Sequence, residues 1–208
     1  MRFHLTYAGP LHGSNTGSPR ARHKHEIRKV FHRQLKRLWD KSWLNTAKFF
    51  DMSNMVGLAG MPETALPDVS KPLRESLASL YKRGAYSYVP LVRQSAALHC
   101  GIDVLFLRPD VPGGIIQSAD IDNRLKTLFD ALRLPTHEAE LGGYETPDTD
   151  EAPFYCLLED DKLVSHVSVS TDVLLEPVED QINDARLFLD IKITPYAVNL
   201  ENLSYAGS

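Results

Sequence analysis

The stretch from Ser118 to Leu132, SADIDNRLKTLFDAL, constrains the fold more than any other part of the sequence. It predicts an amphipathic helix, because apolar residues recur at helical spacing: Leu125, Leu128, Phe129 and Leu132. Two carboxylates, Asp120 and Asp122, stand where this helix would begin. If their backbone is extended, both point to the same side and can hold a hard divalent cation. Asp-x-Asp-Asn is also typical of a helix N-cap, so two interpretations stay open.

A lysine and a second acidic cluster extend this pattern. Lys126 follows Asp122 by one helical turn, and a metal ion and an ammonium group together can share the charge of a phosphoryl transition state. Glu159, Asp160 and Asp161 precede an alternating strand pattern. A carboxylate from this cluster can enclose a metal ion from the side opposite the helix, although a tight turn also explains the two aspartates.

Length and composition predict a globular protein. The 208 residues suit one domain, and the fractions of hydrophobic (43%) and charged (24%) residues are ordinary. The sequence contains neither a long apolar run nor a signal-peptide pattern, which predicts a cytoplasmic protein without a membrane segment. Cys100 and Cys156 lack the spacing of a zinc site or a disulfide framework. We therefore expect two buried thiols.

Charge is distributed unevenly along the chain, whose net charge is -4. The first 42 residues contain ten basic and two acidic residues, whereas the part from Leu134 to Asp190 is acidic. This polarity suggests one face for a polyanion and another that a polyanion avoids.

The basic residues accompany the clearest helical pattern, His25 to Trp43. One stripe of this helix is apolar and much of the remainder is cationic. Beside a phosphodiester site we predict nucleic-acid contacts from the helix and the loop before it: Arg20, Arg22, Lys24, Arg28, Arg33, Lys36 and Arg37. A solvated face is the alternative. His23, His25 and His32 lack metal-site spacing and are interpreted as polar surface residues.

The other periodic segments predict a mixed α/β (α+β) fold, with a helix at Lys71 to Lys82 and five extended segments: Arg2 to Tyr7, Tyr86 to Val92, Gly101 to Arg108, Leu163 onward, and Ala185 to Ile193. Base stacking by Tyr86 and Tyr88 is possible, but strand packing is favoured. Leu44 to Ser70 is expected to be irregular with short helical turns. Thr136 to Pro153, rich in acids, Gly and Pro, is expected to be a flexible excursion.

The order of these motifs resembles the RusA family of Holliday junction resolvases. DIDNRLK, FDAL and EDDKLV match the family's hallmark segments, FHLTYAGPLHGSN its opening strand and loop, GIDVLFLRP the strand before the site, and ARLFLDIKI the closing strand. The resemblance covers nearly the whole chain.

The resemblance implies a compact fold with a mixed sheet and packed helices, and a homodimeric endonuclease that uses Mg²⁺, or Mn²⁺, on branched DNA. Asp120, Asp122 and Asp161 would bind the metal, with Asp160 as a competing third ligand. Lys126 would approach the scissile phosphate. Two further residues would support the site, Asn123 at the helix start and Asp130 behind the ligands.

The chain departs from the family pattern in two insertions within a single domain of residues 1–208, at about residues 44–70 and 134–153. The acidic insertion would repel DNA unless it folds away or contacts a protein. A competing hypothesis is therefore a weak or inactive DNA-binding or assembly protein on a resolvase-like scaffold, with a partner bound through Thr136 to Pro153. A nuclease for RNA or phage DNA intermediates is a third.

Overall fold

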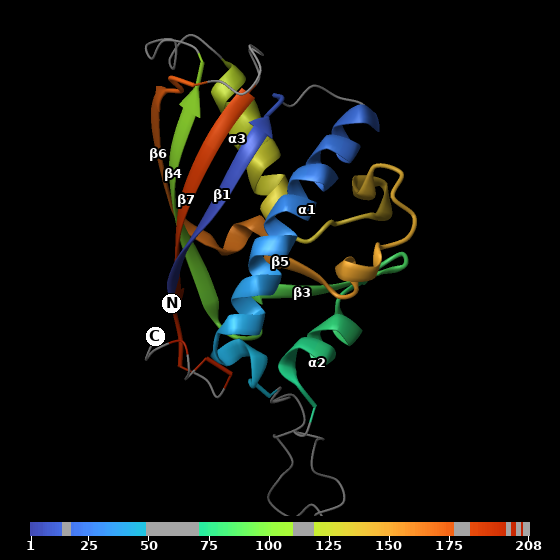
Figure 1. Ribbon diagram of the computed structural model, residues 1–208. Helices are drawn as coiled ribbons and strands as arrows, with labels where there is room; N and C mark the ends of the chain where they lie inside the picture. The colour runs from blue at the N-terminus through green and yellow to red at the C-terminus, as the bar shows by residue number, and fades with distance from the viewer. Residues whose placement is uncertain are drawn as a thin grey trace, which may run out of the picture.

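The computed structural model describes residues 1–13, 18–48, 71–109, 119–176, 184–198, 201–202 and 205, without the side chains of residues 18, 19, 119 and 120. Within this part, the chain forms helices and two sheets (Figure 1). The predicted mixed α/β (α+β) fold is confirmed. Most of the first expected insertion, at about residues 44–70, lies outside the described residues, apart from a short 3-10 turn, η1 (Trp43–Asn45).

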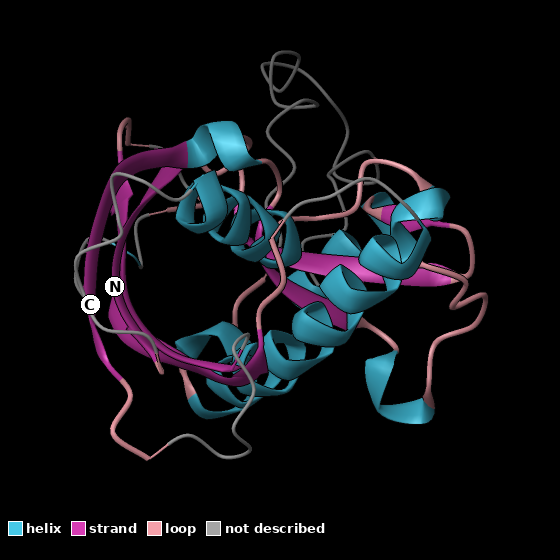
Figure 2. Cartoon of the chain, turned by 90° about the horizontal axis from the view of Figure 1, so that it is seen from above, coloured by secondary structure: helices cyan, strands magenta, loops and turns pink. Residues whose placement is uncertain are grey.

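The larger sheet holds four strands, in the spatial order β1 (Arg2–Pro10), β7 (Asp184–Pro195), β4 (Leu98–Arg108) and β6 (Val164–Val173). β6 runs parallel to β4, and the other neighbours are antiparallel. Burial alternates along β4, where Ile102 and Val104 are buried and Asp103 and Leu105 are exposed. One face of the sheet is therefore covered and the other open. Figure 2 shows a curved sheet whose concave side faces α1 (Ser18–Lys41) and α3 (Ala119–Leu132).

Helix α1 packs through residues four apart, Ile27, Phe31, Leu35 and Trp39, all of which are buried. The helix begins at Ser18, seven residues before the expected start at His25. A Ser-Pro pair there explains the difference, because proline is accommodated in the first turn of a helix. No helix in the described part of the chain is long and apolar enough to cross a membrane.

A smaller sheet of β2 (Lys82–Arg83), β3 (Tyr86–Val92) and β5 (Phe154–Leu158) lies beside α1, with α2 (Leu73–Leu80) against β3. Every residue of β5 is buried, as expected for a parallel strand covered on both faces. Both sheets contribute to one hydrophobic cluster. Tyr86 and Tyr88 are buried, so they pack in the strand and are not exposed for base stacking. Cys100 and Cys156 are buried free thiols, as predicted.

The second insertion, at about residues 134–153, contains two 3-10 turns. η4 (Glu138–Leu141) packs against α1, and η5 (Thr149–Glu151) packs against β5 and forms an ion pair with Lys29 of α1. Gly142 has a φ of +65°, and a Cβ atom there would lie 2.2 Å from the backbone nitrogen of Arg22. Only glycine permits this approach. The expectation of a flexible excursion is wrong, because the segment is folded onto the helix.

Candidate active site

An open pocket lies between α3, β6 and the short turn before β6, η6 (Asp161–Leu163). Its volume is about 470 Å³, and its lining combines charged and apolar side chains: Asp122, Leu125, Lys126, Phe129, Asp130, Asp161, Val164 and Val167. The pocket thus brings together Asp122 and Lys126 with Asp161 from the second acidic cluster. Asp122, Lys126 and Asp161 are all exposed, so a ligand in solvent can reach them.

The charged side of the pocket follows from the helical repeat of α3. Asp122, Lys126 and Asp130 are spaced four residues apart and therefore share one face of the helix. Leu128 and Leu132 lie on another face and are buried in the core. The side chains of Asp122 and Lys126 form no hydrogen bond or ion pair with another described residue. Both charges are free to interact with a ligand.

Asp120 belongs to the first described turn of α3, and its side chain lies outside the described part of the structure. The expectation that an extended backbone would point Asp120 and Asp122 to the same side is wrong, because both residues are helical. Positions two apart in a helix lie about 200° apart around its axis. The role of Asp120 as a metal ligand stays a prediction from the sequence.

The two aspartates of the second cluster occupy different environments. Asp160 caps η6, and its carboxylate accepts a hydrogen bond from the backbone nitrogen of Lys162 at 3.0 Å. This bond, with the nearby Lys162 ammonium, lowers the pKa of Asp160 below its ordinary value. Asp161, but not Asp160, lines the pocket beside α3. Of the two predicted choices, Asp161 is therefore the one that lines the same pocket as Asp122.

Three ligands for a metal ion are not assembled among the described residues. No group of three or more His, Cys, Asp and Glu side chains in that part of the chain is arranged to hold a metal ion. Two carboxylates, Asp122 and Asp161, nevertheless line the pocket and are exposed. Mg²⁺ commonly uses one or two protein carboxylates and completes its shell with water and substrate oxygens, so the chemistry of these residues fits that ion.

Asp130 links the pocket to α1. Its carboxylate forms ion pairs with Lys24 and, at 3.1 Å, with Arg133. Burial alone would raise the pKa of Asp130, but the hydrogen bond from Lys24 and the charge of Arg133 lower it below its ordinary value. The carboxylate is thus ionised and held in place, while its supporting role at the site stays a prediction from the sequence. Asn123 is half-buried in α3, and its backbone oxygen accepts a hydrogen bond from Thr127 at 3.1 Å.

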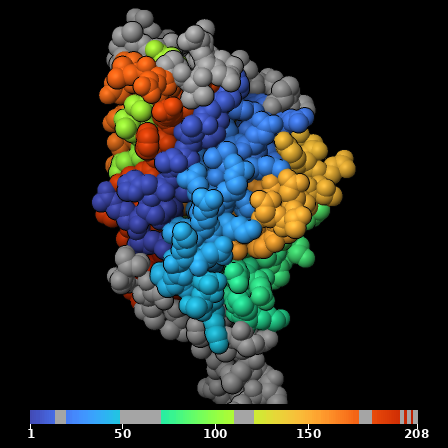
Figure 3. Space-filling view, viewed as in Figure 1, coloured from blue at the N-terminus to red at the C-terminus, as the bar shows by residue number. Residues whose placement is uncertain are grey.

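The acidic insertion binds two lysines of the basic face of α1. Lys29 pairs with Glu151 at 2.8 Å and with Asp148 at 3.0 Å. Burial would lower the pKa of Lys29, but the hydrogen bonds it donates to Glu151 and Asp148 raise it above its ordinary value. Lys36 donates to the backbone oxygen of Asp150 at 3.1 Å. Figure 3 shows the insertion lying directly against α1.

The prediction that Arg28 contacts nucleic acid is wrong, because only 1% of this residue is exposed. Its guanidinium donates to the backbone oxygens of Asp130 at 2.8 Å and of Arg133 at 3.3 Å, and its Nη2 lies 3.9 Å from a carboxylate oxygen of Glu140. Arg28 therefore joins α1, α3 and the insertion as a structural residue.

The remaining basic residues of the predicted interface differ in their contacts. Arg22 pairs with Glu26 at 3.3 Å and lies over the ring of Tyr144. Arg20 is half-buried at the start of α1. Arg33 and Arg37 are exposed and form no ion pair with another described residue, so both are accessible to a ligand.

The prediction that His25 and His32 lie on the surface is wrong, because both are buried. His25 packs against the rings of Tyr144 and Phe154, and burial lowers its pKa to about 3. His32 accepts a hydrogen bond from the backbone nitrogen of Tyr155 at 2.8 Å, and its other ring nitrogen lies 3.0 Å from the backbone oxygen of Asp150. Their spacing of seven residues, two helical turns, indicated one shared face.

Among the described residues, the candidate site is therefore the pocket beside α3 rather than the whole basic helix. Comparisons of the chain with protein-family models, with curated proteins and with solved structures found no match.

Proposed function

We propose that the chain is a metal-dependent endonuclease that hydrolyses phosphodiester bonds in branched DNA such as Holliday junctions. One observation carries the proposal: Asp122 and Lys126 of α3 and Asp161 of η6 line the same open pocket. The RusA-like order of motifs supports the choice of branched DNA as the substrate.

Each residue has a chemical role in this proposal. Asp122 and Asp161 would hold Mg²⁺, or Mn²⁺, with Asp120 as the third carboxylate expected from the sequence. When bound, the ion lowers the pKa of a water molecule and neutralises charge on the phosphate. Lys126, one turn from Asp122, would bind a phosphate oxygen and hold the scissile group near the carboxylates.

The charge of the pocket makes binding depend on the cation. Two carboxylates, Asp122 and Asp161, stand beside one ammonium, that of Lys126, in the described lining of the pocket, because the third carboxylate, Asp130, is already paired with Lys24 and Arg133. Without a cation, the pocket repels a phosphodiester. We therefore expect DNA to occupy the pocket only when a divalent ion is present.

The decisive experiment compares purified protein on a fixed strand sequence presented as a four-way junction, a flap, a linear duplex, a single strand and the corresponding RNA. We expect cleavage of the junction in Mg²⁺, none in EDTA, and slower cleavage of the duplex. Preference for the RNA would favour the third hypothesis. Absence of divalent-dependent cleavage of every DNA form would contradict the proposal.

A DNA-binding or assembly protein without cleavage activity is the second candidate. It is favoured by the lack of a three-ligand metal group among the described side chains. Isothermal titration with Mg²⁺ and Mn²⁺ separates the two functions. The nuclease requires a binding event that Asp122→Asn removes, whereas the assembly protein binds DNA with equal affinity in EDTA.

A further inference from the structure

The pocket beside α3 has an apolar half that the proposed cleavage chemistry does not use. Besides the charged residues, its described lining contains four apolar side chains: Leu125, Phe129, Val164 and Val167. The first two lie four residues apart on α3 and are therefore neighbours on its surface. The other two belong to β6. The apolar half of the pocket is thus formed by one helix and one strand.

The exposure of Val167 shows that this half is open to solvent. Val167 lies in register with Ile102 of β4, on the side of the sheet that faces the helices. Ile102 is fully buried, whereas 45% of Val167 is exposed. Apolar surface therefore stays in contact with water beside the charged residues, and a ligand that covers it gains free energy.

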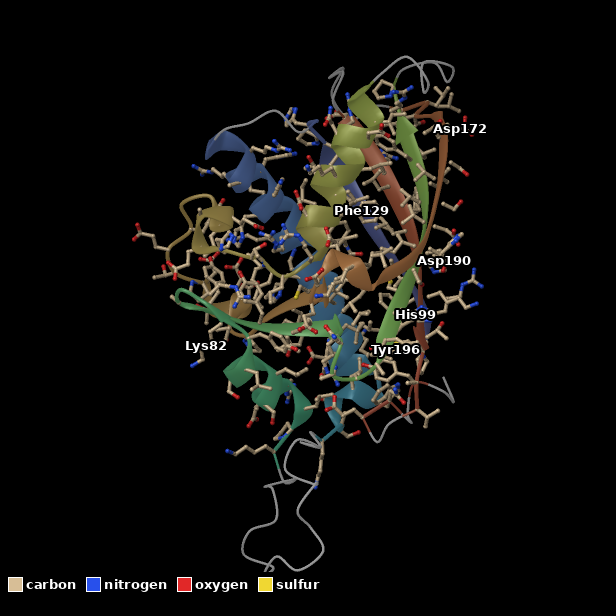
Figure 4. The ribbon with its side chains drawn as sticks, turned by 180° about the vertical axis from the view of Figure 1, so that it is seen from behind. Lys82, His99, Phe129, Asp172, Asp190 and Tyr196 are labelled. Carbon is tan, nitrogen blue, oxygen red and sulfur yellow. The ribbon has the colours of Figure 1, made fainter. Side chains whose placement is uncertain are left out.

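Phe129 supplies an aromatic surface next to the pocket lysine. Figure 4 shows Phe129 on α3, with η6 and the start of β6 beside it. The residue is half-buried and packs in part against the core. Lys126 and Phe129 are three residues apart, so their Cβ atoms lie about 5–6 Å apart on the helix surface. A ligand that joins an anionic group to a flat ring can contact both side chains at once.

We propose that the apolar half of the pocket receives one unpaired nucleobase, from the nucleotide whose phosphate Lys126 binds. The base stacks on Phe129, and Val164 and Val167 contact it from β6. A nucleotide has the required combination of groups, because one sugar links its phosphate to its base. Proteins that hold single strands bind bases on aromatic side chains in the same way. The inference rests on the proposed function, since it places DNA in the same pocket.

The class of substrate becomes narrower as a result. A paired base reaches Phe129 only after it leaves the duplex, and unpairing and unstacking cost free energy. A nucleotide that is already unpaired, at a branch or in a bulge, avoids this cost. We therefore expect the chain to prefer DNA with an unpaired nucleotide at the bound phosphate over a fully paired duplex.

The apolar half selects the unpaired state rather than the identity of the base. Its described side chains carry no hydrogen-bond donor or acceptor, and every base has a face that can stack. Among the charged residues of the lining, Asp130 is already bound by Lys24 and Arg133. All four bases should therefore bind with similar affinity.

Fluorescence anisotropy with three labelled duplexes tests the proposal: one with a single unpaired nucleotide, one with an unpaired abasic nucleotide at the same position, and one fully paired. Ca²⁺, which also takes oxygen ligands, replaces Mg²⁺ so that affinity is measured separately from cleavage. The abasic duplex keeps the phosphate and lacks only the base. We expect the wild-type chain to bind the unpaired base about tenfold more tightly than the abasic nucleotide. Equal affinity for the two would overturn the proposal.

Variants of Phe129 then assign the effect to the pocket. Phe129→Leu keeps an apolar side chain without a ring and should abolish the tenfold difference, whereas Phe129→Tyr keeps the ring and should retain it. Phe188→Leu is the matched control and should also retain it, because Phe188 is 45% exposed on the opposite face of the sheet. A folded Phe129→Leu chain that still distinguishes the two duplexes would contradict the proposal.

Circular dichroism checks that each variant is folded. If Phe129→Leu does not fold, Val167→Gln takes its place, because Val167 is exposed and a polar amide there should also abolish the difference in affinity. Retention of the tenfold difference in folded Val167→Gln would then count against the proposal.

The same measurements separate this inference from the proposed function. Cleavage in Mg²⁺ without a base-dependent affinity contradicts the inference alone. A base-dependent affinity without cleavage in Mg²⁺ supports the base-binding pocket and contradicts the nuclease. A chain that binds none of the three duplexes overturns the inference, whether or not it cleaves a junction.

Discussion

Helices α1 and α3 are both amphipathic and charged, but they use their charges in opposite ways. On α1, lysines 24, 29 and 36 and Arg28 bind groups elsewhere in the chain. On α3, Asp122 and Lys126 are exposed in an open pocket. The density of charge in a sequence therefore does not locate a binding surface. What decides is whether the rest of the chain supplies partners for those charges.

The largest test of this difference is the removal of Arg28. Arg28→Met deletes a buried guanidinium that binds two backbone oxygens, and should lower the free energy of unfolding by about 3 to 5 kcal/mol. Arg33→Met, at an exposed position on the same helix, should change it by less than about 0.5 kcal/mol. Urea denaturation measures both. Equal effects would show that Arg28 is not the structural residue of the pair.

The pocket lysine gives the next largest effect, on activity rather than stability. Lys126→Gln removes the one lysine among the described residues that line the pocket, and should slow DNA cleavage about a hundredfold, or about 2.7 kcal/mol, without changing the urea midpoint. Lys162→Gln is the control, since Lys162 is exposed but does not line the pocket. An equal loss of cleavage rate in both variants would mean that the net charge of the protein, and not Lys126 itself, causes the effect.

Much of the fold follows from local patterns, whereas the role of the insertion does not. Short apolar segments predicted β4 and β7, and the apolar stripe predicted α1, because a local pattern reports which residues are buried. The acids, Gly and Pro of residues 134–153 resemble a solvated loop. Their anchors, Arg28, His25 and His32, lie more than a hundred residues earlier in the chain, and one sequence contains no record of such contacts. The resemblance in motif order placed Asp161 at the predicted site. The sequence alone could not show that Asp161 and Asp122 line one pocket, because the two residues lie far apart in the chain.

The buried histidines predict a smaller, pH-dependent effect. Burial, with the charges of Arg28 and Lys29, lowers the pKa of His25 to about 3 in the folded chain, while the unfolded chain keeps the ordinary value of 6.5. The unfolded state alone gains a proton below pH 6.5, so stability is complete above that pH and declines toward pH 3. At pH 5.5 the loss is about 1.4 kcal/mol from His25.

Urea denaturation at pH 8 and pH 5.5 measures this loss. His25→Phe should reduce the pH dependence by that amount, although it also changes packing and must be compared with itself at the two pH values. The exposed His137→Gln should leave the dependence unchanged. A wild-type chain equally stable at both pH values would contradict the burial of a neutral histidine.

The smallest expected effect concerns the cations that α1 leaves exposed. Arg33→Gln with Arg37→Gln should weaken DNA binding only a few-fold and reduce the slope of log affinity against log salt by at most about 2. Fluorescence anisotropy over a salt series measures both quantities. A loss of binding larger than that of Lys126→Gln would mean that α1, not α3, is the DNA surface.

The most direct test of the central claim is the single-turnover rate of cleavage of a four-way junction over a Mg²⁺ titration. We expect the wild-type rate to saturate with Mg²⁺. Asp122→Asn and Asp161→Asn should each reduce the rate by about a hundredfold or more while the chain stays folded, and Asp160→Asn, which alters only the cap of η6, should stay within a few-fold of wild type. Wild-type protein that does not cleave DNA in Mg²⁺, or variants at both pocket aspartates that cleave at the wild-type rate, would contradict the account.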